Sequence, residues 1–251
     1  ALEKDPQNKV EILNKLTETF ITSDPDRALA FAQRAFDIAE EQDLKEAKLT
    51  SMINMAEIYW SKTKLKSSLQ YATKAKELAK LLGKESDYAE ALLIIGKIHS
   101  ELGDYDKSSG LNFEALKILE QQDDKIGIGK AFSRIGSVFF EQENFDKALE
   151  YFLKSLAISR EINDQNGIAR ALNNVAAVYG INQDHKNLDI YLLEAIKLNK
   201  QIGERLWEGI NYLNFGTSNM EQKHYDSAIF YFHRAETIFK QLNNLPALAS
   251  V

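Results

Sequence analysis

A sequence pattern that recurs at a constant interval constrains this chain more strongly than any other feature. The pattern centres on a large residue followed by a small one, at Met55-Ala56, Ile95-Gly96, Ile135-Gly136, Val175-Ala176 and Phe215-Gly216, and more weakly at Lys15-Leu16. Two further columns in the same register hold mostly small residues, at Ala28, Ser68, Ser108, Ala148, Leu188 and Ala228, and at Ala35, Ala75, Ala115, Ser155, Ala195 and Ala235. A fixed period held this often indicates stacked helical repeats that share one continuous core.

The period divides the chain into helix pairs joined by tight turns. The predicted units are residues 8–42, 45–82, 85–122, 125–162, 165–202 and 205–242, followed by a truncated seventh unit over 245–251. Turns are expected near residues 23, 63, 103, 143, 183 and 223, where turn-forming residues such as Gly103 and Asn144 occur. Each helix would hold about 17 residues and extend roughly 25 Å at about 1.5 Å per residue.

Three glycines fall in the middle of predicted helices, at Gly96, Gly136 and Gly216. Glycine costs about 0.5–1 kcal/mol relative to alanine at such positions. That cost is tolerable where a neighbouring helix approaches closely, so Gly136→Leu should overpack the contact and cost about 1–3 kcal/mol or more. Gly136→Ala should be milder.

Composition excludes several classes of function. The chain is 44% hydrophobic and 27% charged, as in a soluble folded protein, and its net charge of −6 argues against general binding to nucleic acid or anionic membranes. There is no cysteine, so disulfides, thiol catalysis and thiolate metal sites are excluded. No apolar run approaches the roughly 18 residues that span a bilayer. The chain begins ALEKDP, without an initiator methionine or signal peptide, and is expected to be part of a longer protein.

The repeat motifs resemble a known family. The pattern I-G-x-x-F…N-F-x-x-A-x-x-x-F-x-x-S over residues 135–155 resembles the tetratricopeptide repeat, as does I-G-x-x-H…D-Y-x-x-S over residues 95–108. The resemblance covers essentially the whole chain, although the period is longer than that of the commonest form of the repeat. It implies an all-α, right-handed solenoid of six helix hairpins plus the start of a seventh, forming one superhelical domain over residues 1–251. It is specific for fold and unspecific for activity.

A closer resemblance bears on the biological role. The segments DYDKS, NFDKALEYFLKSL and SDPDRALAFAQRA resemble the N-terminal halves of bacterial two-component sensor kinases and helix-turn-helix regulators. This implies a sensing or partner-recognition region, either in the bacterial cytoplasm or on the periplasmic side of a membrane-anchored receptor.

No catalytic constellation can be assembled from the sequence. The four histidines are His99, His185, His224 and His233. His99 falls where the family carries a packed aromatic residue, and His224 and His233 are too far apart in sequence to bind one metal from a single helical turn. Phosphate-binding glycine loops and hydrolase motifs are also missing. We therefore expect neither a metal nor a cofactor, and an enzyme ranks last among the functions considered.

The resemblance implies that the first helix of each unit lines the inside of the superhelix. The residue two before the glycine column would then face the groove, at Asn14, Asn54, Ile94, Arg134, Asn174 and Asn214. An asparagine amide can both donate to and accept from an extended peptide backbone. The alternative is that asparagine is simply common at this position of the repeat.

A second column, six residues before the glycine position, adds positive charge. Lys130 lies one turn before Arg134, and Arg170 follows one unit later beside Asn173 and Asn174. This group predicts a patch that receives a carboxylate or acidic side chain. The alternative is that the cations pair with neighbouring acids such as Glu90, Glu101 or Glu141.

Some arrays of this family grip a C-terminal carboxylate with Lys and Arg on one helix and with Lys and Asn on the two preceding helices. Lys130 and Arg134 match the first part of that pattern. Ile53, Glu57 and Ile94 stand where asparagine or lysine would be needed, so this carboxylate clamp is not expected here. The apolar column Phe20, Trp60, Phe140 and Met220 is left open between side-chain pockets and core.

The sequence thus predicts a non-catalytic module that binds a protein or peptide in a groove. The predicted groove residues are Asn54, Lys130, Arg134, Arg170, Asn173, Asn174 and Asn214. We expect the sensing part of a larger bacterial signalling protein, with a scaffold or co-chaperone array as the alternative. Neither nucleic-acid binding nor membrane insertion is expected of this region.

The last residues predict that the array continues. Pro246 suits the first turn of a helix, and Ala249 follows a column of small residues at Ala89, Gly129, Ala169 and Gly209. The preceding helix, with Ile229, Phe232, Ile238 and Phe239, would have an uncovered apolar face without that continuation. End-to-end self-association is therefore expected, and an extension by one unit should improve solubility and stability.

Overall fold

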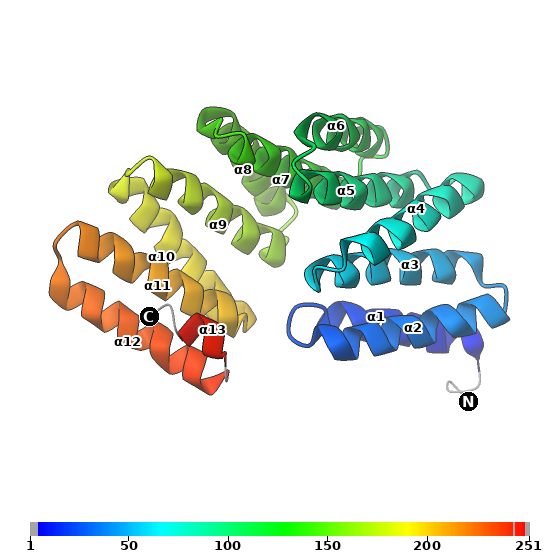
Figure 1. Cartoon of the computed structure of the whole chain (residues 1–251), viewed down its shortest axis with the longest axis horizontal. Coiled ribbons are helices and arrows are strands. Elements are labelled where there is room, and N and C mark those ends of the chain that lie inside the picture. Colours follow the sequence, from blue (N-terminus) through cyan, green and yellow to red (C-terminus); the bar gives the residue numbers. More distant parts are fainter. Residues whose placement is uncertain (1–4, 243, 249–251) are drawn as a thin grey trace. The chain divides into compact units, whose positions relative to one another are not determined.

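The computed structural model describes residues 5–242 and 244–248, without the side chains of Leu245 and Pro246. Every regular element in these residues is an α-helix (Figure 1). The helices are α1 (Pro6–Phe20), α2 (Pro25–Glu41), α3 (Lys45–Ser61), α4 (Leu65–Leu82), α5 (Glu85–Glu101), α6 (Tyr105–Gln121), α7 (Lys125–Glu141), α8 (Phe145–Glu161), α9 (Gln165–Ile181), α10 (His185–Ile202), α11 (Arg205–Glu221), α12 (Tyr225–Gln241) and α13 (Leu245–Leu248). The predicted all-α array of helix pairs is confirmed.

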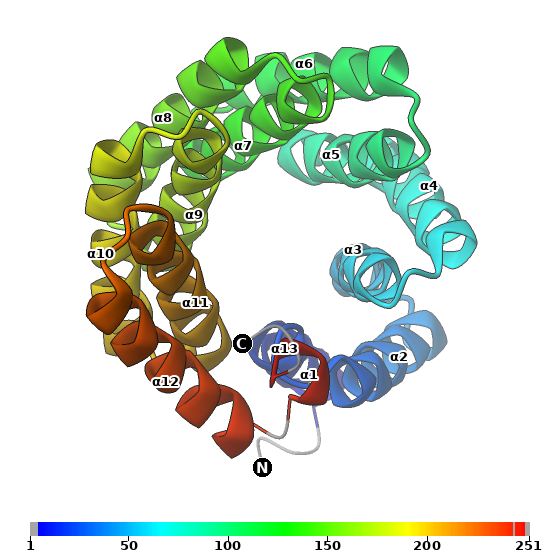
Figure 2. The same ribbon diagram turned by 60° about the vertical axis from the view of Figure 1, so that its left-hand side comes forward.

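The helices fall into two compact units, residues 1–138 and 139–251. In the first unit, α3 packs against both α1 and α5, while α2 and α4 pack between these first helices on the other side. Figure 2 shows α3 and α5 in one layer, with α4 and α6 in the other. In the second unit, each helix from α8 to α13 packs against the next. First helices therefore share one layer of the first unit and can present a common surface.

The turns after helices α2 to α11 share one backbone feature. A residue with positive φ follows each helix from α2 to α11, at Asp43, Thr63, Gly83, Gly103, Asp123, Glu143, Asn163, Gln183, Gly203 and Lys223. After α3, the Thr63 N–H donates to the Trp60 carbonyl and the Lys64 N–H to the Tyr59 carbonyl, both at 2.8 Å. This pair of bonds is the Schellman motif, which satisfies the last carbonyls of a helix. The predicted turn positions from 63 to 223 are confirmed.

Thr63 is the β-branched residue among these left-handed positions, with φ at 56°. A β-branched side chain is strained in that region of φ, and glycine is not. We expect Thr63→Gly to raise the free energy of unfolding by about 0.5–1 kcal/mol, after the larger chain entropy of unfolded glycine is counted. Urea denaturation would measure it. The reverse change, Gly83→Thr at φ 65°, should be destabilising, and a destabilised Thr63→Gly variant would contradict the argument.

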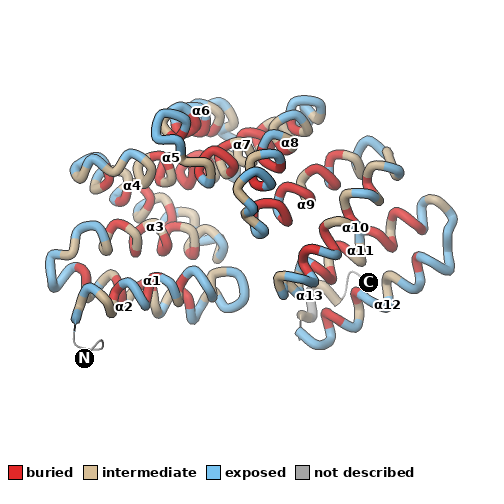
Figure 3. The backbone as a smooth tube through the Cα atoms, turned by 180° about the vertical axis from the view of Figure 1, so that it is seen from behind, coloured by how far each residue is buried: buried red, intermediate tan, exposed pale blue. Residues whose placement is uncertain are grey.

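The small-residue columns form the contacts between helices. All of the positions predicted in the two second-helix columns are buried, from Ala28 and Ala35 in α2 to Ala228 and Ala235 in α12. Figure 3 shows the buried residues along the facing sides of the helices and the exposed ones at the turns. Alanine and serine let the helix backbones approach, and larger neighbours such as Phe152 and Leu172 fill the remaining space.

Close approach also explains the mid-helix glycines. A Cβ on Gly96 would lie 2.5 Å from Oδ1 of Asn112 on α6, and a Cβ on Gly216 would lie 2.7 Å from the Phe232 ring on α12. Both contacts are to the second helix of the same pair, so the predicted close approach of a neighbouring helix is confirmed at these two positions. Gly136 is buried within α7, and its tolerance of larger side chains stays a prediction.

A helix does begin at Leu245, as predicted. The Asn244 side chain accepts the Ala247 N–H at 3.1 Å, and Ala247 packs against the core around Ala235 and Phe239. The expected exposure of α12 was wrong for two residues, because Ile238 and Phe239 are buried among α11, α12 and α13. Ile229 is exposed, as are Tyr225 and Phe230 on the same helix. Residues 249–251 lie outside the described residues, and self-association stays a prediction.

Candidate functional site

Three first helices of the first unit bring charged and aromatic side chains together. Glu57 and Trp60 stand one turn apart on α3, Glu90 and Lys97 lie on α5, and Lys130 and Arg134 lie one turn apart on α7. We call these six residues the charged cluster. Lys97 follows Glu57 by exactly one repeat, and Lys130 follows Glu90 in the same way. Equivalent positions on adjacent first helices lie side by side along the helix axes, and this brings each acid beside a cation.

Glu57 is the centre of the charged cluster. Its Oε2 accepts a hydrogen bond from Lys97 Nζ at 3.1 Å, and its Oε1 lies 3.6 Å from Arg134 Nη2. Lys97 Nζ also lies 3.1 Å from the centroid of the Trp60 ring, a cation–π contact. On the same layer, Lys130 Nζ donates to Glu90 Oε1 at 2.8 Å. Glu57 thus bridges α5 and α7 from α3.

The electrostatics keep Glu57 ionised. Burial acts to raise the pKa of its carboxyl, but the charges of Lys97 and Arg134, the Lys97 hydrogen bond and the more distant Lys130 together hold the pKa below its ordinary value. The cluster holds three cations and two carboxylates, so it carries one excess positive charge in a chain whose net charge is −6. This excess belongs to the six residues alone, because Asp87 adds a further carboxylate near Glu90.

Two of the predicted residues of the first unit, Lys130 and Arg134, belong to the charged cluster. Lys130 pairs with Glu90, which is the alternative pairing foreseen from the sequence, and Arg134 pairs with Glu57, an acid not named among those alternatives. Arg134 keeps 29% of its side chain exposed and Lys130 keeps 36%, so both remain accessible. Lys97 was not predicted from the sequence as the partner of Glu57. The opposite charges of these two residues at equivalent repeat positions could have predicted the pair.

Asn54 differs from its counterpart in the preceding repeat. Asn14 Nδ2 donates to the Ala47 carbonyl at 3.4 Å, and Ser51 Oγ donates to Asn14 Oδ1 at 3.0 Å. One period later, Ala91 takes the place of Ser51. Asn54 is only 9% exposed, and its Nδ2 is buried with no hydrogen-bond partner among the described residues. A buried amide donor without a partner is costly.

The missing hydroxyl can be restored. In Ala91→Ser, the serine oxygen should accept a hydrogen bond from Asn54 Nδ2 and raise the free energy of unfolding by about 1 kcal/mol, the usual net value of a hydrogen bond. Ala131→Ser is the matched control, because Ile94 occupies the position that faces it in this register. That control should lower stability by about 1 kcal/mol. Chemical denaturation of both variants would test this, and equal losses would show that Asn54 does not face residue 91.

The remaining predicted residues lie in the second unit. Arg170 is exposed on α9, with Asn173 and Asn174 half-buried beside it, and Asn214 is exposed on α11. Asn173 Oδ1 is buried and has no hydrogen-bond partner within the described part of the chain. That all seven predicted residues form one groove stays a prediction.

A serine, a histidine and an aspartate meet between α10 and α11, but their geometry is not that of a catalytic triad. Ser218 Oγ donates to Asp189 Oδ1 at 2.8 Å, while His185 Nδ1 lies 3.4 Å away from the same oxygen of Ser218. Asp189 also accepts from Gln222 at 3.1 Å. Asp189 therefore holds the serine hydroxyl instead of orienting the imidazole as a base, and Ser218 is buried. The group links two helices through polar contacts.

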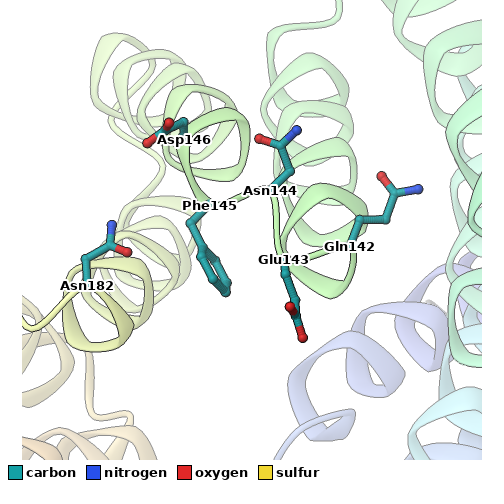
Figure 4. A pocket seen from close by; sticks show the side chains of 6 residues that line it. All are labelled: Gln142, Glu143, Asn144, Phe145, Asp146 and Asn182. Carbon is teal, nitrogen blue, oxygen red and sulfur yellow. The ribbon is translucent and has the colours of Figure 1, made fainter.

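The other candidate features are structural or shallow. No group of His, Asp and Glu side chains in the described residues is arranged to hold a metal. An open depression at the turn between α7 and α8 is lined by Gln142, Glu143, Asn144, Phe145, Asp146 and Asn182 (Figure 4). Of the apolar column, Phe20 packs on Phe31, Phe140 packs on Phe145, and Met220 is exposed. Trp60 belongs to the charged cluster.

Comparison with known proteins identifies the repeat. Residues 127–187 match the tetratricopeptide repeat family. The chain folds as a tetratricopeptide repeat array. No curated protein sequence matches this array. No helix of its described residues is both long enough and apolar enough to cross a membrane.

Several solved structures share the fold of the array at low sequence identity. A signal-transduction ATPase with a tetratricopeptide repeat sensor from Pyrococcus horikoshii superimposes with a TM-score of 0.77 at 20% identity, over 98% of this chain and 39% of that one. A Rap protein complexed with competence and sporulation factor gives 0.75 at 16% identity, over 95% and 77% of the two chains. NprR in complex with its cognate peptide NprX gives 0.64 at 16% identity, over 92% and 67%. These similarities establish the fold alone.

Proposed function

We propose that this array binds a protein or peptide segment along the first helices, and that acidic side chains of the ligand contact Arg134 and Lys130. The observation that carries the proposal is the excess positive charge of the charged cluster on the shared surface of α3, α5 and α7. Arginine and lysine that keep part of their side chains accessible can form charge-assisted hydrogen bonds to a carboxylate.

One neighbouring feature suits a peptide. Trp60 offers an aromatic surface beside the cations. The unpaired amide nitrogen of Asn54 is buried and would become a ligand contact only after nearby side chains rearrange. Aromatic residues and arginine are the side chains most often found at the energetic centres of interfaces. Within the second unit, Arg170, Asn173, Asn174 and Asn214 would also contact the ligand.

The similar structures support binding rather than catalysis. NprR is described in complex with a cognate peptide, and the Rap protein in complex with competence and sporulation factor. By analogy, we propose that this array is the recognition region of a larger bacterial signalling protein. The similarity to the ATPase, whose tetratricopeptide repeats are described as a sensor, favours this role over that of a passive scaffold.

A peptide-display selection tests the proposal directly. A random library is panned on the wild-type array, and each selected peptide is titrated against wild type and against the double variant Lys130→Glu/Arg134→Glu. We expect the selected peptides to be rich in Asp and Glu and to lose most of their affinity for the variant. Peptides that bind both proteins equally would place the binding surface elsewhere.

A further inference from the structure

We propose that Glu57 is a built-in competitor for the anion site of the array, so that a ligand carboxylate must displace Glu57 from Arg134 before it can bind. This inference rests on the proposed function and adds a specificity-determining residue to it. It assigns Glu57 an opposing role, although Glu57 is the residue that holds the charged cluster together.

The two bonds of Glu57 differ in strength. The contact with Lys97 is a hydrogen bond of 3.1 Å, and Lys97 is held further by the Trp60 ring and is only 11% exposed. The contact with Arg134 is 3.6 Å long, which is too long for a good hydrogen bond. The link between Glu57 and Arg134 is therefore the weaker one and the first to be exchanged.

Arg134 has the capacity to take another anion. A guanidinium carries five N–H donors in a planar fork that matches a carboxylate, and a single loose ion pair uses little of this capacity. Its side chain is 29% exposed, so a ligand can reach it from solvent. An incoming carboxylate that bonds to the fork would take over the position now occupied by Glu57 Oε1.

The competition sets a charge requirement for the ligand. With Glu57 ionised, one acidic group on the ligand only replaces an attraction that already exists, and its net gain is small. A ligand with several acidic side chains can also contact Lys130, which is 36% exposed and pairs with Glu90. The preferred ligand class is thus a peptide with a cluster of Asp or Glu residues, rather than one with a single carboxylate.

The test uses a hexaglutamate peptide with acetylated and amidated ends, titrated into the array by calorimetry at low ionic strength. Glu57→Gln keeps the shape of the side chain and removes its charge. We expect this variant to bind the peptide about three- to tenfold more tightly than wild type, because one nearby repulsive charge is gone. Glu90→Gln should give a smaller gain, because Lys130 is already more accessible than Arg134.

The outcomes separate the two proposals. Weaker binding by Arg134→Glu together with unchanged binding by Glu57→Gln would overturn the competitor role and leave the proposed site intact. Unchanged binding in both variants, or no binding by wild type, would overturn the proposed site itself. A hexaglutamate peptide with a free C-terminus is the comparison that reveals terminal-carboxylate recognition. Much tighter binding of that peptide, with an affinity that Glu57→Gln does not change, would also contradict the inference.

A second variant covers a failure of Glu57→Gln to fold, which circular dichroism would reveal. Glu57→Asp keeps the charge but shortens the side chain by one methylene, so the already long contact with Arg134 should break before the contact with Lys97. We expect its affinity for the blocked hexaglutamate peptide to rise about twofold or more. An affinity equal to or below that of wild type would overturn the proposal.

Discussion

Gly216→Leu is expected to destabilise the protein by about 3 kcal/mol, the upper end for overpacking a close helix contact. The first added carbon would already lie 2.7 Å from the Phe232 ring and 3.3 Å from the backbone carbonyl of Ala228. The ring can shift slightly, but the helix backbone cannot move without breaking the α11–α12 pair. Urea denaturation followed by circular dichroism would measure the loss.

Gly110 supplies the control for this experiment. It also lies inside a helix, but a Cβ there would meet nothing within 4 Å. Gly110→Leu should therefore be neutral or stabilising, because leucine is the better helix former by several tenths of a kcal/mol. If the two leucine variants unfold at the same urea concentration, glycine at position 216 is not there for close approach. The same comparison can then be extended to Gly136.

Arg134→Glu is expected to weaken the binding of an acidic peptide by at least about tenfold, or about 1.4 kcal/mol. The substitution removes the cation with the most unused donors and places a second carboxylate next to Glu57, 3.6 Å from the present guanidinium. Like charges at such distances repel strongly where solvent is partly excluded. Titration of a peptide selected on the wild-type array would give the change in affinity, and the difference should shrink at high salt.

Arg34→Glu is the matched control, because it makes the same change in net charge at an exposed position of the second helix α2. Its effect on peptide affinity should be small, since exposed charges farther apart than about 10 Å are largely screened at 0.1 M salt. A loss equal to that of Arg134→Glu would mean that the peptide responds to total charge and not to the charged cluster. An unaltered affinity in Arg134→Glu would reject the proposed site.

The features that repeat were predictable from the sequence. The small columns, the mid-helix glycines and the turns at Thr63 or Gly103 recur in register, so each copy supports the interpretation of the others. The exposure of Ile238 and Phe239 was mispredicted because both side chains pack against α11 near Gly209, with further cover from α13.

The charged cluster was harder to predict because its pairs are made of unlike residues. A comparison of equivalent repeat positions detects those that keep one residue type. Glu57 and Lys97 occupy equivalent positions but form an ion pair because their charges are opposite. The asparagine column shows the opposite problem. Asn14 and Asn54 look equivalent in sequence, yet Ser51 bonds the first, and Ala91 in the next repeat offers the second no hydroxyl. Column identity alone did not reveal the change of partner.

The left-handed residues that end the helices recur once per helix, from Asp43 to Lys223, while the side-chain pattern recurs only once per helix pair. The backbone conformation is therefore the same at the ends of α2 to α11. The side chains alone determine whether a helix is the first or the second of its pair. Deleting a whole helix pair, such as α3 and α4 between the turns at Asp43 and Gly83, would bring together helix surfaces that already match in the repeat. Deleting one helix with its turn would leave every other turn intact but set each later helix in the opposite layer. The array can accordingly be lengthened or shortened in helix pairs, and a single-helix change would exchange its ligand-facing and outer surfaces from that point onward.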